Sequence, residues 1–160
     1  MVSPALAEGL MARYWIVVGG PEVFAKTAEM GFTRHGFKST RRIMASKIMP
    51  GDMLVFYVTG KKQFGAIARV KSTVVEERTR IWQNSKKPDE MYPYRADIEA
   101  VVTPPEERWL DAEPYHDRFS WTQKWPRANW TLAYQGNLHE IPEADFHLIE
   151  ADMGATVASR

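Results

Sequence analysis

The side chains in this sequence that could do chemistry are basic residues interleaved with aromatic rings. Residues 34–87 contain thirteen Lys or Arg and three Asp or Glu, a net charge of +10, together with Phe37, Phe64 and Trp82. The rest of the chain has 8 basic and 17 acidic residues and carries −9. Basic groups bind phosphates and aromatic faces stack on bases, so the pattern indicates nucleic-acid binding if the fold gathers these loops on one face. Charges dispersed over a solvated surface are the alternative.

Other kinds of chemistry find less support. The chain has no Cys, which excludes disulfides, thiolate metal sites and a Cys nucleophile. Gly19-Gly20 alone is too weak for a dinucleotide loop, and the P-loop, GxSxG and HExxH patterns are absent. The four His, at 35, 116, 139 and 147, lack the close spacing of metal ligands. We therefore expect a non-enzymatic protein without cofactor or metal. A hydrolase that uses His35 or His116 beside a carboxylate is the rival hypothesis.

Length and composition describe an ordinary globular domain. The chain has 160 residues, 44% apolar and 26% charged, which fits one domain. We expect a flexible tail over 1–12, a single domain over 13–152 and a C-terminal tail over 153–160. No apolar run is long enough to span a membrane, and residues 1–15 do not resemble a signal peptide. With the lack of Cys, these features favour a cytoplasmic protein.

The elements that must position these residues follow from the periodicity. Apolar or alternating segments predict four strands, at 13–18, 53–59, 63–75 and 92–102. Pro21 begins a predicted helix that Gly31 ends, and Pro142 begins a last helix that Gly154 ends. Residues 32–42 are predicted as a basic loop, with Thr40 capping a short helix. Sequential hairpins with few helices favour an α+β fold with a small barrel or strongly curved sheet.

Five segments in this order carry a resemblance to a known family. They are YWIVV at 14–18, PGDMLVFYVTG at 50–60, FGAIARV at 64–70, YPYRADIEAV at 92–101 and AYQGNLHEIPEADFHLI at 133–149. The chain resembles the EVE-domain proteins, of the PUA-like superfamily that also holds the YTH domains. The resemblance implies a PUA-like curved mixed β-sheet closing toward a barrel, with flanking helices. YTH domains flip N6-methyladenine of RNA into an aromatic cage, and EVE domains look like readers of modified bases.

Matching positions then identify a predicted site. Trp82 matches the second cage Trp, Phe37 or the Lys38 slot stands at the first, and Met91 or Tyr92 at the third wall. Base-edge contacts of the family correspond to Val18, Gly19 and Gly20, and its phosphate-binding Arg falls near Gly136, where this chain has none. The predicted base pocket comprises Trp82, Phe37, Tyr92, Ser39, Thr40 and Gly20. The predicted phosphate ligands are Lys38, Arg41, Arg42, Lys61 and Lys62.

The leading hypothesis is a nucleic-acid-binding module that recognises a modified base in DNA or RNA. The first alternative is the small nucleotide-processing hydrolase already described. The second is a small-molecule or protein-binding scaffold whose aromatic residues form the core, with the acidic region 88–117 as the partner surface.

Overall fold

The computed structural model describes residues 12–158. A mixed sheet runs in the order β2-β6-β4-β3-β1-β8, and the short strands β5 and β7 pair with β6 and β4. Strands β1 and β3 are parallel, whereas the other pairs are antiparallel. The strands are β1 (Tyr14–Gly19), β2 (Arg34–Phe37), β3 (Met53–Val58), β4 (Gln63–Val70), β5 (Val75–Glu76), β6 (Tyr94–Val102), β7 (Leu110–Asp111) and β8 (Leu138–Ile141). This is the curved PUA-like α+β fold that the resemblance implied.

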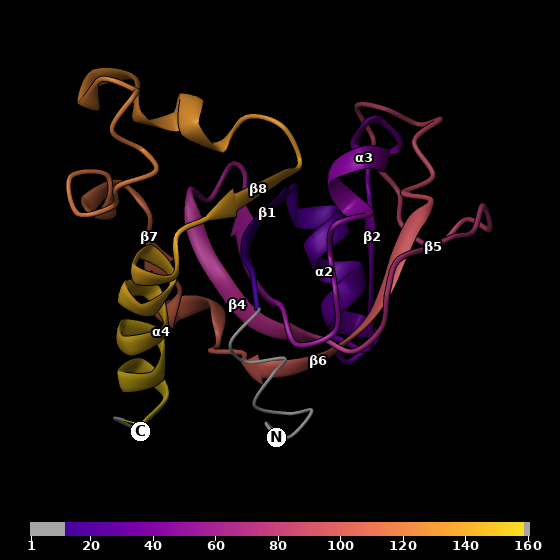
Figure 1. Cartoon of the computed structure of the whole chain (residues 1–160), viewed down its shortest axis with the longest axis horizontal. Helices are drawn as coiled ribbons and strands as arrows, with labels where there is room; N and C mark the ends of the chain where they lie inside the picture. The colour runs from indigo at the N-terminus through magenta and orange to yellow at the C-terminus, as the bar shows by residue number, and fades with distance from the viewer. Residues whose placement is uncertain (1–11, 159–160) are drawn as a thin grey trace, which may run out of the picture.

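Helices cover both faces of the sheet. They are α2 (Pro21–Glu29), α3 (Arg42–Ala45) and α4 (Glu143–Ala158), with the 3-10 segments η1 (Ser39–Arg41), η2 (Glu106–Arg108), η3 (Glu113–Tyr115) and η4 (Arg127–Tyr134). The sheet curls around α2 and α3, and α4 lies on its other side (Figure 1). Two cores result, because β3 is buried on both faces: Leu54 and Phe56 face one core, Val55 and Tyr57 the other. The parallel β1–β3 pair is connected through α2, β2 and α3.

The predicted elements are mostly present, with four corrections. The predicted basic loop 32–42 contains β2, which pairs with β6 despite its polar residues. The second hairpin strand ends at Val70 instead of 75, and β8 was not predicted. Thr40 does not cap α3, because Arg41 occupies the N-cap position without a side-chain hydrogen bond.

The chain ends differ from the predicted tails. Gly154 does not end the last helix, which continues to Ala158. Residues 153–158 are therefore helical, and Met153 is fully buried against the sheet. The predicted tail at 1–12 lies almost entirely outside the described residues. Within 12–158, the helices are too short or too polar to cross a membrane.

Candidate functional site

Three chain segments meet at the end of the half-barrel where β1 stops. The amide of Asn137 donates from Nδ2 to Val18 O (2.8 Å), and its Oδ1 accepts from Lys38 N (2.9 Å). Thr59 N, just after β3, donates to Gly19 O (2.9 Å). Asn137 is buried and fully bonded, so it fixes the end of β1 against the start of η1. Sequence analysis did not identify Asn137, whose only signal was its place in the turn after Gly136.

The predicted aromatic walls are buried in this conformation. Phe37 and Trp82 are 0% exposed and Tyr92 is 1% exposed. Trp82 and Tyr92 lie together, with ring centroids 6.4 Å apart, whereas Phe37 packs in the core beneath α2 and α3. Trp82 Nε1 donates to Thr27 Oγ1 at 2.9 Å. Contact of these rings with a base stays a prediction, and it requires the loop 78–91, which contains Trp82, to open.

Arg95 organises that loop, which runs over residues 78–91. Its side chain is fully buried, and its guanidinium carbon lies 5.2 Å from the Trp82 ring centroid. Arg95 donates to Tyr92 O (3.0 Å), to Met91 O (3.1 Å) and to both oxygens of Thr79. A buried charge needs such a complete set of partners. One buried arginine therefore holds together this loop, of which Trp82 is itself a part.

Two carboxylates attach the loop to its surroundings. Glu22, in the first turn of α2, accepts from Ser85 N (3.1 Å) and Ser85 Oγ (2.7 Å). Glu90 accepts from Ser39 N (3.0 Å) and Ser39 Oγ (2.9 Å), and also from Tyr92 N (2.9 Å). The hydroxyl of Ser39, a predicted pocket residue, is thus already bonded within the protein. Gly20, another, is the N-cap of α2.

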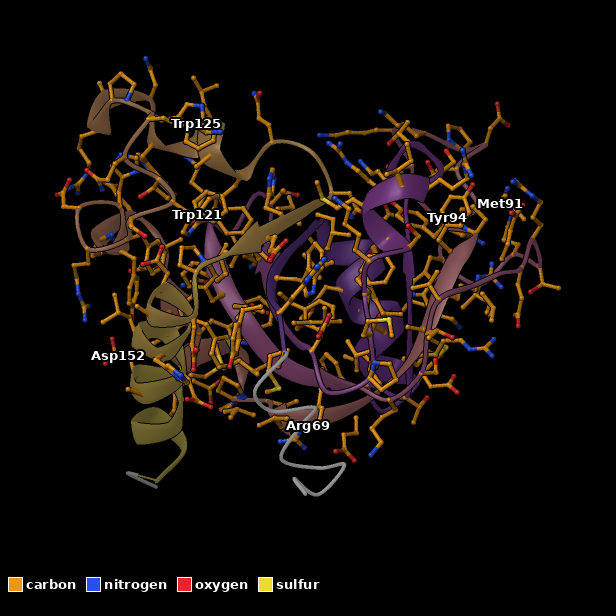
Figure 2. All side chains as sticks on the ribbon, in the orientation of Figure 1. Arg69, Met91, Tyr94, Trp121, Trp125 and Asp152 are labelled. Carbon is orange, nitrogen blue, oxygen red and sulfur yellow. The ribbon has the colours of Figure 1, made fainter. Side chains whose placement is uncertain are left out.

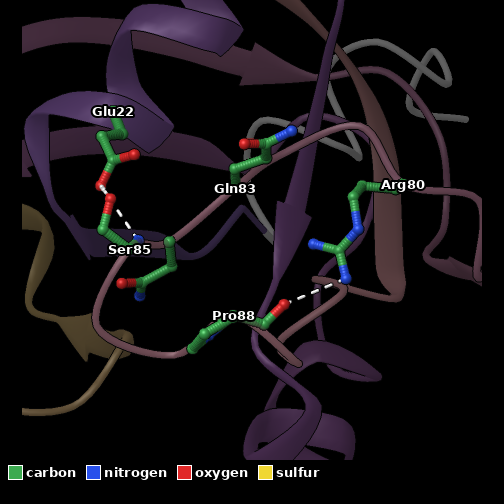
Figure 3. A pocket seen from close by; sticks show the side chains of 6 residues that line it. Glu22, Arg80, Gln83, Ser85 and Pro88 are labelled. Carbon is green, nitrogen blue, oxygen red and sulfur yellow. Dashed lines mark hydrogen bonds between the residues drawn. The ribbon is translucent and has the colours of Figure 1, made fainter.

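A polar pocket of about 290 Å³ lies between this loop and α2 (Figure 3). Its lining comprises Glu22, Arg80, Gln83, Asn84, Ser85 and Pro88. Figure 3 shows Arg80 across the pocket from the bonded pair Glu22 and Ser85. Asn84 Nδ2 donates to the hydroxyl of Tyr92 at 3.0 Å, so the pocket lining connects to the buried aromatic pair. No motif marked the residues that line this pocket, and none of them was among the predicted site residues.

Ion pairing divides the basic residues of 34–87 into two sets. Several pair with carboxylates: Arg34 with Glu77, Lys61 with Glu106, Arg69 and Lys71 with Glu99, and Arg78 with Glu76. Others have no ion pair among residues 12–158: Lys38, Arg41, Arg42, Lys47, Lys62, Arg80, Lys86 and Lys87. Only the second set is free to hold phosphates without first breaking a pair.

Four of these eight unpaired cations, Lys38, Arg41, Arg42 and Lys47, lie around η1 and α3. A hollow of about 430 Å³, here called the basic hollow, is lined by Ser39, Thr40, Arg41, Arg42, Ile43, Met44 and Lys47. Lys38 adjoins it. Burial lowers the pKa of Lys38, and the positive charges of Lys87 and Arg41 lower it further, which places the loop 78–91 beside this surface. Predicted residues Lys38, Thr40, Arg41 and Arg42 are therefore brought together.

Arg41 also lies over Gly136. A Cβ atom at position 136 would collide with Arg41 Nη2, and Gly136 has a φ of 80°, which favours glycine. The resemblance placed a phosphate-binding Arg near this position. The chain lacks that side chain in sequence, but the guanidinium of Arg41, from η1, lies beside Gly136.

Lys61 and Lys62 lie elsewhere. They line a separate hollow of about 300 Å³ that includes the carboxylates of Asp111 and Glu113. Lys61 Nζ is 2.9 Å from Glu106 Oε2. This hollow shares no lining residue with the basic hollow, so the structure does not join these two lysines to the other predicted phosphate ligands.

The two histidines of the hydrolase hypothesis are buried. His35 Nδ1 lies 2.8 Å from Thr27 Oγ1, and His116 Nε2 lies 2.8 Å from Trp125 O. Within the part of the chain that the structure describes, neither hydrogen-bonds a carboxylate, and no group of three or more acidic or His side chains could hold a metal. Thr27 Oγ1 also accepts from Trp82 Nε1, so this hydroxyl links the two buried rings.

Acid is expected to weaken the fold through His35. Burial lowers the pKa of His35 from 6.5 to about 3. Between these two pH values, His35 is protonated in the unfolded chain and neutral in the folded one. The stabilisation is present above pH 6.5 and is lost as the pH falls toward 3. Urea unfolding should show a loss of about 2 kcal/mol between pH 7 and pH 5 from this residue. The variant His35→Gln, which keeps an acceptor for Thr27, should lack that component; an unchanged pH dependence would contradict it.

Comparison with known proteins identifies the family and gives the same fold. Residues 13–151 match the family model described as EVE domain. The crystal structure of the MmI1 YTH domain has a TM-score of 0.64 at 14% identity, covering 93% of this chain and 100% of that one. A complex of the YTH domain-containing protein mmi1 with RNA has a TM-score of 0.65 at 14% identity, covering 93% and 85%.

A third similar structure comes from a bacterium. Rpa0253 from Rhodopseudomonas palustris has a TM-score of 0.59 at 15% identity, covering 90% of this chain and 94% of that one. Comparison with curated proteins gives no match. Because the family model spans nearly the whole described chain, this protein belongs to the EVE domain family.

Proposed function

We propose that this EVE domain is a non-enzymatic module that binds nucleic acid and recognises a modified base in DNA or RNA. The observation that carries the proposal is the position of four unpaired cations, which gather at the basic hollow beside the loop 78–91. Phosphates would contact the cations of the basic hollow, and a flipped base would enter next to Trp82. A YTH structure with the same fold in complex with RNA supports a nucleic acid as the partner.

The sugar-phosphate backbone of the nucleic acid would bind at the basic hollow. Arg41, Arg42 and Lys47 line it and form no ion pair among the described residues, although Glu90 accepts from Ser39 at its edge. Ile43, 69% exposed, gives it an apolar side. Arg41 over Gly136 supports this assignment, because its guanidinium lies beside the position near which the resemblance placed a phosphate-binding Arg. Lys61 contributes less in this proposal, since Glu106 already neutralises it.

The base would enter between α2 and the loop 78–91. Entry requires release of Ser85 from Glu22, or of Ser39 from Glu90, because these contacts close the loop. Both contacts are exposed and lie between side chains that water can also solvate, so each holds the loop only weakly. Aromatic stacking is worth roughly 1–3 kcal/mol per base, enough to offset such contacts once Trp82 is uncovered.

Removing one cation of the basic hollow is expected to weaken binding to all sequences alike. The variants Arg42→Gln and Lys47→Gln should each reduce the slope of log affinity against log salt by about one, because one phosphate contact is lost. The measurement is fluorescence anisotropy with single-stranded DNA and RNA oligonucleotides, each plain or carrying one modified base, at two salt concentrations.

The matched control is Lys71→Gln. Lys71 lies within the same basic sequence window, but it is near Glu99 (3.8 Å). Its loss should leave the salt slope unchanged. Equal slopes for all three variants would mean that the basic hollow is not the phosphate surface. Equal affinity of the wild type for plain and modified oligonucleotides throughout the panel would argue against base recognition.

A further inference from the structure

A group of unpaired polar atoms lies around His139 of β8. Among the described residues, five buried atoms have no hydrogen-bond partner: Arg41 Nε, Trp121 Nε1, Tyr134 OH and His139 Nε2 belong to this group, and His116 Nδ1 is the fifth. Buried polar groups in folded proteins are almost always bonded, so each unpaired one requires an explanation such as a missing ligand or water. Four in one region indicate a shared partner.

These four residues, here called the Trp121 cluster, are neighbours. The Trp121 ring centroid is 5.3 Å from that of Tyr134 and 5.9 Å from that of His139, on which it stacks. A Cβ atom at Gly136 would lie 3.7 Å from His139 Cε1 and against Arg41 Nη2, so these two side chains also meet. Tyr134 is 4% exposed, whereas Trp121 and His139 are half-buried. The cluster therefore reaches from the core to the surface.

Two cations and one buried carboxylate lie around the cluster. Burial lowers the pKa of His139, and Arg41 and Lys124 lower it further, so both cations act on the same imidazole. Lys124 Nζ lies 4.4 Å from the ring centroid of Trp125. Burial raises the pKa of Tyr134, and the carboxylate of Asp145 raises it further, but the Asp145 oxygens accept from Ser120 and from the backbone N–H of Trp121. This carboxylate is thus already bonded, and the unpaired donors still lack an acceptor.

We propose that the Trp121 cluster is a phosphate-binding site, separate from the basic hollow, in which Trp121 Nε1, Tyr134 OH and Arg41 donate to phosphate oxygens. Lys124 adds positive charge at its edge. A set of N–H and O–H donors in a positive field matches an oxyanion better than a base edge, which presents donors as well as acceptors.

The position of the cluster extends the proposed function, on which its biological use rests. Figure 2 shows Trp121 and Trp125 on one side of β8 and Met91 and Tyr94 on the other. Arg41 lies between the two regions, because it lines the basic hollow and also contacts the cluster at Gly136. A strand whose base enters beside Trp82 could therefore place a more distant phosphate on Trp121.

Indole NMR signals test this site directly. Titration of the whole protein with inorganic phosphate should shift the Trp121 N–H signal saturably, whereas chloride at matched ionic strength should not. Trp15, Trp82 and Trp109 are internal controls, since their indole N–H groups already donate to Asp52, Thr27 and Pro104. Their signals should stay in place. Trp121→Phe assigns the signal.

Two variants examine the donors. Tyr134→Phe removes only the hydroxyl and should weaken phosphate binding about tenfold, as expected for loss of one hydrogen bond to a charged group. Lys124→Gln should also weaken it, whereas Lys71→Gln, outside the cluster, should not. Unchanged Trp15 and Trp82 signals establish that each variant is folded. A Trp121 signal that does not move with phosphate, or that moves equally in Tyr134→Phe, overturns the proposal and leaves water as the partner.

Oligonucleotides distinguish the source of the phosphate. If the site takes an internal diester, a single strand with a 5′-hydroxyl should shift the Trp121 signal as far as the same strand with a 5′-phosphate. If it takes a terminal phosphate, only the phosphorylated strand should do so. An oligonucleotide that binds without moving the Trp121 signal would overturn this inference and keep the proposed function. If the Trp121 signal responds to inorganic phosphate but the protein binds no oligonucleotide, this inference stands and the proposed function is overturned.

Discussion

Replacement of Trp82 by alanine is expected to lower the free energy of unfolding by about 3–5 kcal/mol, the usual cost of emptying a buried aromatic site. Trp82 is 0% exposed, donates to Thr27 and lies beside the buried guanidinium of Arg95. The substitution removes these interactions: Thr27 loses the donor from Trp82 but keeps its bond to His35, and Arg95 loses its aromatic contact but keeps its bonds to backbone oxygens. Urea unfolding monitored by circular dichroism measures the change.

The size of this loss also reports on the state of the base site in solution. Trp125→Ala is a matched control, because Trp125 is only half-buried and its cation contact is with the exposed Lys124, so its loss should be far smaller. A cost for Trp82→Ala below about 1.5 kcal/mol would mean that the loop 78–91 leaves the ring largely uncovered. That result would favour a preformed open cage over the closed loop described above.

The sequence was sufficient to predict the curved sheet and its hairpin, because β1, β3 and β4 are apolar along most of their length. It was insufficient for β2. The segment RHGF combines charge, His and Gly, which alone favour a loop. His35 is buried there because Thr27, from α2, hydrogen-bonds its Nδ1, and Thr27 in turn accepts from Trp82 of a distant loop. Tertiary contacts of this kind leave no local pattern.

Counting charges along the sequence had a similar limit, because it does not show which charges pair in the fold. The window 34–87 contains the cations of the basic hollow, but it counted Arg69 and Lys61 equally with Arg42, although carboxylates at Glu99 and Glu106 pair with the first two. Those partners lie outside the window, so sequence could not remove them. The same holds for Arg41, whose approach to Gly136 joins residues about a hundred positions apart.

Gly36→Ala is expected to disrupt the Trp82 region strongly. A Cβ atom at Gly36 would lie 2.6 Å from Tyr92 O, 2.7 Å from Trp82 Cζ3 and 2.9 Å from Tyr92 Cβ. Two of these atoms belong to backbone or to a Cβ, which cannot rotate away, so β2 or the loop must shift. Overpacking of this kind costs about 1–3 kcal/mol, which thermal or urea unfolding will detect. Binding should also change, because the shift moves Tyr92 and Trp82 away from the positions that the base site needs.

Gly20→Ala separates this steric effect from a general loss of glycine. At Gly20 the nearest atom to a new Cβ is Thr59 Oγ1 at 3.7 Å, an ordinary contact, and its φ of −77° suits alanine. Its cost should be about 0.5–1 kcal/mol, because alanine is disfavoured relative to glycine at an N-cap. In the binding assay Gly36→Ala should lose the preference for a modified base while keeping the wild-type salt slope, since the basic hollow is untouched. If Gly36→Ala instead kept that preference and reduced the slope, the base would bind away from Trp82, and the aromatic pair would serve only the core.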